Sequence, residues 1–255
     1  MTSTPSQASI SHVSPRARFG LIIPATNTVV EAEFNRMLVP AISWHTARIE
    51  ISNPSLNSDE AMLAFLAHLR DNIQAAVTSV LHCQPTHLVM GMSAETFWGG
   101  QEGAREFEGL MREISGLGVT TGARAAKEAL DVYGARKIGI VTPYQAVGDR
   151  QVLEFFVGLG FEVCGIRGFR CESATSIAEV HPDRIKEAFR EVDGESVDAL
   201  FQAGTNLPAA KAAAEMEVEL GKPVIAVNTA TVWHAYRSNG ILDKIDGFGS
   251  LLSQH

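Results

Sequence analysis

Small neutral side chains that can donate hydrogen bonds follow four short apolar runs of the sequence, at 20–23, 87–90, 136–142 and 198–202. Those that stand just behind these runs are Asn27, Ser93, Tyr144, Thr205 and Asn206. Hydroxyl and amide groups of this kind, together with backbone N–H groups, can surround a small carboxylate without a metal ion. The sequence therefore predicts an anion-binding site made of neutral donors, provided that the fold brings the four places together.

The first apolar run shows which elements hold the donors. Gly20–Ile23 has the length and composition of a parallel strand that is covered on both faces, and Pro24 ends it. Thr28 and Glu31 have the spacing of a capping box, which predicts that their side chains begin a helix. Because a helix N-terminus attracts anions, the loop before it can seat a carboxylate. The alternative is that Asn27 and Thr28 only cap the helix.

The same order of strand, loop and helix recurs along the chain. Further strands are predicted at 42–51, 87–90, 136–142, 161–166, 198–202 and 224–227, and helices at 59–82, 101–115, 121–133, 147–159, 181–192, 209–220 and 230–238. The pattern that starts at Arg18 starts again at Arg136, about 118 residues later. This repeat predicts an α/β fold of two pseudo-symmetric Rossmann-like halves with parallel sheets and right-handed crossovers. We expect a disordered tail at 1–16, an N-terminal half at 17–133, a C-terminal half at 134–240, and an extension at 241–255 that packs on the N-terminal half or forms a tail.

The predicted sheets place the donors at one cleft. Ligands of open parallel sheets bind beyond the carboxyl ends of the strands. That rule brings together the loops 24–28, 91–98, 143–145 and 204–206, with Asn228 and Thr229 nearby. We therefore expect the active site between the two halves.

Composition excludes several classes of function. The formal net charge is -8 and no basic cluster occurs, which argues against nucleic acid as a partner. No apolar run approaches the roughly 18 residues that span a bilayer, and residues 1–15 lack the apolar core of a signal peptide. We expect a cytoplasmic protein that binds neither nucleic acid nor membrane.

Metals and nucleotide cofactors are also disfavoured. The three cysteines, Cys83, Cys164 and Cys171, lack C-x-x-C spacing, so we expect neither a disulfide framework nor a zinc site. No glycine-rich phosphate loop follows the first strand. The sequence predicts chemistry without a cofactor.

Four stretches together resemble the aspartate/glutamate racemase superfamily, in its branch of maleate cis-trans isomerases and arylmalonate decarboxylases. They are residues 20–31, the loop 91–93, residues 142–144 and residues 222–228, and the resemblance covers most of residues 17–240. It implies two α/β halves, cofactor-independent chemistry at their interface, a small acid as substrate and a homo-oligomer. The family's first-loop asparagine matches Asn27 and its tyrosine matches Tyr144, while its second-loop hydroxyl pair is half retained as Met92 and Ser93.

The chain departs from this family at its cysteines. Racemases and maleate isomerases of the family carry one cysteine in each half, and arylmalonate decarboxylase keeps the second, whereas the matching positions here are Gly91 and Gly204. Two-base racemisation and a covalent cysteine adduct are therefore disfavoured. Of the three cysteines, only Cys171 lies in a loop that can approach the cleft.

These observations lead to one preferred function and two alternatives. We expect a lyase or isomerase that acts on a small mono- or dicarboxylic acid through an enolate-like intermediate, with Glu95 replacing the thiols as acid or base. The alternatives are a non-catalytic carboxylate-binding protein, and a hydratase or hydrolase in which Glu95 activates water. The predicted catalytic residues are Tyr144, Ser93 and Glu95, and the predicted substrate-binding residues are Thr26, Asn27, Gly91, Met92, Gly204, Thr205, Asn206 and Asn228.

Overall fold

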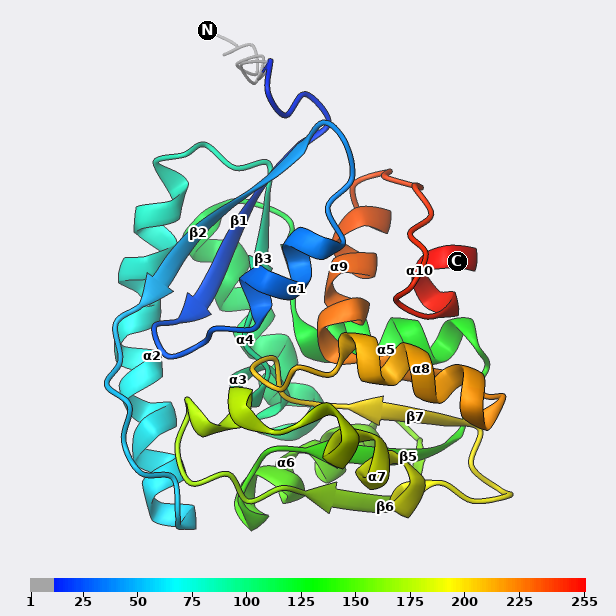
Figure 1. Cartoon of the computed structure of the whole chain (residues 1–255). Helices are drawn as coiled ribbons and strands as arrows, with labels where there is room; N and C mark the ends of the chain where they lie inside the picture. Colours follow the sequence, from blue (N-terminus) through cyan, green and yellow to red (C-terminus); the bar gives the residue numbers. More distant parts are fainter. Residues whose placement is uncertain (1–11) are drawn as a thin grey trace, which may run out of the picture.

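Two four-stranded parallel sheets organise the computed structural model, which describes residues 12–255. The first contains β1 (Ala17–Pro24), β2 (Ile42–Ile49), β3 (His87–Met90) and β4 (Val119–Thr120) in the order β2-β1-β3-β4. The second contains β5 (Lys137–Thr142), β6 (Glu162–Gly168), β7 (Ala199–Gln202) and β8 (Val224–Ala226) in the order β6-β5-β7-β8. The second sheet thus repeats the order of the first. Figure 1 labels three strands of each sheet, β2, β1 and β3 in one and β6, β5 and β7 in the other. The predicted α/β class with two pseudo-symmetric halves is confirmed.

Helices connect and cover the strands. They are α1 (Val30–Arg36), α2 (Asp59–Leu81), α3 (Ala94–Phe97), α4 (Gly100–Ser115), α5 (Gly122–Val132), α6 (Ala146–Gly158), the 3₁₀ helix η1 (Ser176–Glu179), α7 (Pro182–Val192), α8 (Ala210–Leu220), α9 (Val227–Arg237) and α10 (Ser250–Gln254). Polar N-cap side chains begin three of them: Ser58 accepts a hydrogen bond from Ala61 N before α2, Thr121 from Arg124 N before α5, and His181 from Asp183 N before α7.

The central strands are apolar runs because both of their faces are covered. β3 and β7 are buried along their whole length, and so is nearly all of β1. The largest core cluster joins side chains of both sheets, among them Phe19, Ile140 and Phe201, with Val232 of α9. The two halves therefore share one core, and α5 and α9 pack against each other within it (Figure 1).

Two local predictions are wrong. The capping box at Thr28 and Glu31 does not form, because Asn27 Oδ1 already accepts the N–H groups of Val29 and Val30, and Glu31 pairs with Arg48 instead. The helix predicted at 230–238 is α9, and it begins at Val227 rather than at residue 230. Asn228 therefore lies in the first turn of α9 and not in a loop.

Hydrogen bonds connect the first described residues and the C-terminal segment to the rest of the protein. Residues 1–11 of the predicted tail 1–16 lie outside the described residues. Arg16, the last residue of that tail, donates hydrogen bonds to Pro40 O and to Asp243 in the C-terminal segment. Ser250 N, at the start of α10, donates to Glu217 Oε1 of α8. The last residues are thus held by both halves.

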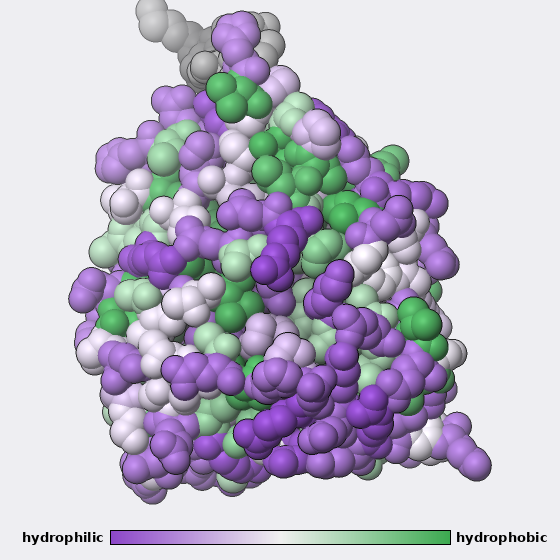
Figure 2. Space-filling view, viewed as in Figure 1, coloured by the Kyte–Doolittle hydropathy of each residue, from purple (hydrophilic) through white to green (hydrophobic). Residues whose placement is uncertain are grey.

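The visible surface is mostly hydrophilic, and hydrophobic residues gather chiefly in the upper part of the view (Figure 2). Within residues 12–255, none of the helices combines the length and the apolar character needed to cross a membrane.

Candidate functional site

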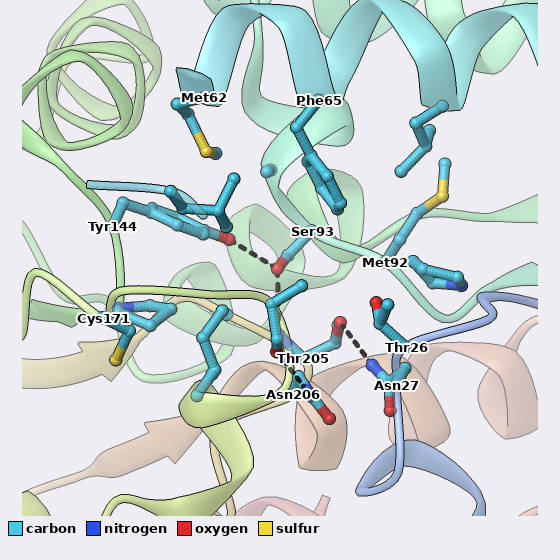
Figure 3. Close-up of a pocket in the computed structure, with 18 of the residues that line it drawn as sticks. Thr26, Asn27, Met62, Phe65, Met92, Ser93, Tyr144, Cys171, Thr205 and Asn206 are labelled. Carbon is cyan, nitrogen blue, oxygen red and sulfur yellow. Dashed lines mark hydrogen bonds between the residues drawn. The ribbon is translucent and has the colours of Figure 1, made fainter. Parts of the chain in front are cut away.

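One cavity lies at the carboxyl ends of the two central strands of each sheet. It is lined by residues of all four predicted loops, which follow β1, β3, β5 and β7 (Figure 3). Its volume is about 70 Å³, a size that suits a small acid rather than a nucleotide. Predicted site residues that line it are Thr26, Asn27, Met92, Ser93, Glu95, Tyr144, Gly204, Thr205 and Asn206.

Two buried hydroxyls form the polar centre of the cavity. The Ser93 Oγ and Tyr144 Oη atoms are 2.7 Å apart, and Ser93 Oγ also accepts the N–H of Thr205 at 3.0 Å (Figure 3). Burial raises the pKa of Tyr144, so the phenol stays neutral and acts as a donor. The two hydroxyls carry one hydrogen each, and only one of these hydrogens is needed for the bond between Ser93 and Tyr144. The other hydrogen is left for a bound oxyanion.

Two asparagines fix the loops around this centre. Asn27 Oδ1 caps α1 at 3.0 Å from the N–H groups of Val29 and Val30, and its Nδ2 faces Thr205 Oγ1 at 3.4 Å. Asn206 Oδ1 accepts Thr28 N at 3.0 Å, and its Nδ2 donates to Ala174 O at 2.8 Å. Both side chains therefore join loops, and each Nδ2 uses only one of its two hydrogens in these contacts.

Backbone amides add further donors. In the part of the chain that the structure describes, the N–H groups of Thr26, Ser93 and Asn206 have no hydrogen-bond partner. All three residues line the cavity, and its described lining contains no Lys, Arg or His. The site can therefore stabilise negative charge only through neutral dipoles, as an oxyanion hole does.

Glu95 is the acidic side chain of the cavity. It is 6% exposed, its Oε1 accepts Arg70 Nε at 2.6 Å, and its buried Oε2 has no partner among the described residues. Burial raises the pKa of Glu95, while the Arg70 guanidinium opposes that shift. Burial thus favours the protonated form more than in an exposed glutamate, and a carboxyl group on the cavity wall can transfer a proton.

The thiols are poorly placed for chemistry. Cys171 lines the cavity, but Figure 3 shows its sulfur turned away from the hydroxyls of Ser93 and Tyr144. Burial raises the pKa of Cys171 to about 11, so it is a thiol and a weak nucleophile at neutral pH. Cys83 and Cys164 are exposed elsewhere. Residues 12–255 also hold no group of His, Cys, Asp or Glu side chains arranged to bind a metal ion.

Apolar side chains close the cavity opposite the hydroxyls. Met62 and Phe65 point from α2 toward Ser93 and Tyr144 (Figure 3), and Leu56 and Ile177 also contribute to this wall. Two segments beside the central loops meet here, since Leu56 N donates to Glu172 O and Asn53 Nδ2 donates to Thr175 Oγ1 at 2.8 Å. The cavity thus has polar groups on one side and an apolar cover on the other.

Two predicted substrate-binding residues do not line the cavity. A Cβ atom at Gly91 would lie 2.5 Å from Ile23 Cγ2, so a side chain there would enter the core. Asn228 lies behind the 204–206 loop, where its Nδ2 donates to Thr205 O at 2.9 Å. Gly204 does line the cavity, and its φ of +123° together with a Cβ position 2.5 Å from Pro143 Cδ favours glycine there.

The sequence alone did not indicate Arg70, Phe65 or the other apolar cover residues. Phe65 and Met62 lie on the buried stripe of a long amphipathic helix, so their spacing resembles that of ordinary core residues. Arg70 is half exposed on the same helix, and nothing in its spacing marks Glu95 as its partner.

Comparison with known proteins gives the family. A family model described as arylmalonate decarboxylase matches residues 19–252. A maleate isomerase of Geobacillus stearothermophilus is 23% identical over 254 residues, which cover 92% of this chain and 97% of that protein. An arylmalonate decarboxylase of Bordetella bronchiseptica is 25% identical over 241 residues, which cover 92% of this chain and 96% of that protein.

Solved structures show the same fold. A Cys-to-Ser mutant of Nocardia farcinica maleate cis-trans isomerase, with a covalently bound succinylcysteine intermediate, is similar with a TM-score of 0.84 at 24% identity, covering 93% of this chain and 98% of that one. A structure of arylmalonate decarboxylase gives a TM-score of 0.75 at 19% identity, with 92% and 98% covered. Because the family model spans most of the sequence, the chain belongs to the arylmalonate decarboxylase family.

Proposed function

We propose that the protein is a cofactor-independent lyase or isomerase that acts on a small carboxylic acid through an enolate-like intermediate. The observation that carries this proposal is the buried pair of Ser93 and Tyr144, 2.7 Å apart, with one hydroxyl hydrogen left for a ligand. The similar proteins are maleate isomerases and arylmalonate decarboxylases, which supports a small acid as substrate. No step of the proposal needs a metal, because neutral donors face the place where negative charge develops.

The hydroxyls of Ser93 and Tyr144 and the unpartnered N–H groups of the cavity, together called the oxyanion cage, explain how a bond next to a carboxylate is broken. When a malonate loses CO₂, the bond between the α-carbon and one carboxyl breaks, and its electron pair moves onto the remaining carboxylate as an enediolate. The free hydroxyl hydrogen of the Ser93 and Tyr144 pair and the N–H groups of Thr26 and Asn206 are available to stabilise that charge. Such donors bind the transition state better than the substrate, and this difference accelerates the reaction.

We assign the proton transfer to Glu95. Its unpartnered Oε2 and raised pKa favour the protonated form, and a bound anion favours that form further. The Glu95 proton moves to the α-carbon of the enediolate, and the resulting carboxylate regains a proton from water. Arg70 stabilises the carboxylate during the interval.

The position of the cysteines favours proton transfer over covalent isomerisation. The maleate isomerase structure described above carries a succinylcysteine, whereas none of the four loops of this cavity holds a cysteine. Cys171, on the cavity wall, is a protonated thiol at neutral pH. Decarboxylation, or another reaction that ends in protonation of an enolate, therefore fits the site best.

A substrate screen tests the proposal. Purified protein is incubated in deuterated buffer with maleate, substituted malonates, hydroxy acids and amino acids, and proton NMR follows turnover and α-deuteration. We expect turnover of at least one acid, with Tyr144→Phe and Asn27→Ala both reducing it. The proposal fails if both variants leave turnover and affinity unchanged, and carboxylate binding without turnover would indicate a binding protein. The homo-oligomer and the cytoplasmic location stay predictions, to be tested by gel filtration and cell fractionation.

A further inference from the structure

A buried carboxyl group lies behind the cavity, on the far side of the 204–206 loop. Glu33 of α1 is 6% exposed and does not line the cavity. Its Oε2 accepts Asn228 Nδ2 at 2.6 Å, and its Oε1 accepts Ala210 N, at the start of α8, at 3.0 Å. The carboxyl group therefore joins three elements, of which α1 belongs to the first half and α8 to the second.

Asn228 connects this carboxyl group to the loop. Its Nδ2 donates both to Glu33 and to Thr205 O, at 2.9 Å. Two acceptors on one nitrogen fix the orientation of the amide, because only the NH₂ group can donate twice. The Thr205 carbonyl is thus held toward Asn228.

The same contact orients an amide of the cage. In a trans peptide the N–H points opposite to the C=O, so holding Thr205 O toward Asn228 directs the Asn206 N–H away from it. Asn206 lines the cavity, Asn228 does not, and the Asn206 N–H has no partner among the described residues. We propose that Glu33 is a positioning residue, which acts through Asn228 to aim the Asn206 N–H at the developing oxyanion. This inference rests on the proposed function, and it adds Glu33 and Asn228 as residues that act on the cavity from behind the 204–206 loop.

The charge on Glu33 supports this role. Burial raises the pKa of Glu33 to about 7, although the hydrogen bonds from Asn228 and Ala210 and the charge of Arg36 lower it. The ionised form accepts both hydrogen bonds, so the loop is held best when Glu33 is charged. The titratable groups on the packed elements are Glu31 and Arg36 of α1, Lys211, Glu215, Glu217 and Glu219 of α8, and His234, Tyr236 and Arg237 of α9. Of these, only Arg36 contributes to the shift.

The variant Glu33→Gln tests the positioning role in activity. A carboxamide has one acceptor oxygen, so either Asn228 or Ala210 N loses its partner. We expect kcat to fall about 10- to 100-fold with little change in KM, since an oxyanion donor acts in the transition state. Glu215→Gln, an exposed change on α8, is the matched control and should keep kcat within about twofold.

A double variant separates positioning from stability. In Glu33→Gln with Asn228→Asp, the two side chains can bond again with donor and acceptor exchanged, but position 228 no longer donates to Thr205 O. We expect the melting temperature to recover toward the wild-type value while kcat stays low. Recovery of kcat together with stability would overturn the proposal, because it would mean that the contact is only structural.

An NMR titration tests the same inference without any substrate. The backbone amide signals of Thr205 and Asn206 should shift with a midpoint near pH 7 in the wild-type protein, and this shift should vanish in Glu33→Gln. No titration at these amides, or a titration that persists in the variant, would overturn the role of Glu33. Titration without turnover of any acid would instead refute the proposed function and leave the positioning intact.

Discussion

Replacing Tyr144 by Phe removes one of the two hydroxyl hydrogens at the centre of the cavity. The Ser93 Oγ to Tyr144 Oη distance of 2.7 Å and the bond from Thr205 N allow two arrangements. If Tyr144 donates to the substrate, the variant loses an oxyanion donor, and kcat falls about 100- to 1,000-fold, or ~2.7–4 kcal/mol. If Ser93 donates to the substrate, the variant loses only the bond that orients Ser93, and a net cost of about 1 kcal/mol lowers kcat roughly fivefold.

The chain offers a matched control for this variant. Tyr133 Oη lies 2.7 Å from Ser250 Oγ, outside the cavity, so Tyr133→Phe removes the same kind of bond without touching the cage. Steady-state kinetics by proton NMR and melting curves are measured for both variants. We expect similar losses of stability but a fall in kcat for Tyr144→Phe alone. If kcat of Tyr144→Phe stays within about twofold of the control, the oxyanion-cage account is refuted.

Three further outcomes follow from the charged and thiol groups. If Glu95 donates the proton, kcat/KM falls as pH rises through the raised pKa of Glu95. Arg70→Met should move that fall to higher pH, because it removes the cation that lowers the pKa of Glu95. A pH–rate profile with the opposite slope would make Glu95 a base. Cys171→Ser should keep kcat within about twofold in the same NMR assay, because the thiol has a pKa of about 11, and a loss of more than tenfold would contradict this. Glu33 binds its proton more tightly in the folded state, so the free energy of unfolding falls by roughly 3 kcal/mol as pH rises from about 4.5 to about 7. Urea unfolding of Glu33→Gln should show a flatter profile over that range, and an identical slope in both proteins would argue against the shift.

The sheets could be predicted because their signal is local. Continuous apolar runs such as 20–23 and 87–90 are typical of strands buried on both faces, and both became central strands. Parallel pairing then places their carboxyl ends together, so the meeting of the four loops needed no knowledge of side chains. β4 has only two residues, Val119 and Thr120, which is too short for a pattern.

The faces and partners of polar residues could not be predicted in the same way. Asn27 and Thr28 are adjacent candidate caps of α1. The contact that holds Thr28 in place is the hydrogen bond from its N–H to Asn206, which is far away in the sequence and could not be predicted. Asn228 follows a strand, as the residues of the four loops do. However, α9 begins at Val227, so Asn228 lies in its first turn and its side chain contacts the 204–206 loop from behind the cavity. Glu33 resembles a solvated helix residue in the sequence, because its partners Asn228 and Ala210 come from the other half of the chain.

Deuterium incorporation by the Cys171→Ser variant tests the central claim, enolate chemistry without a catalytic cysteine. The acid that reacts fastest in the screen is incubated with this variant in deuterated buffer, and proton NMR measures α-deuterium in the product. We predict one deuterium per turnover at a rate within about twofold of wild type, and almost none when Glu95→Gln is added. Loss of product and of deuteration in Cys171→Ser alone would contradict the account and place the thiol at the centre of the reaction.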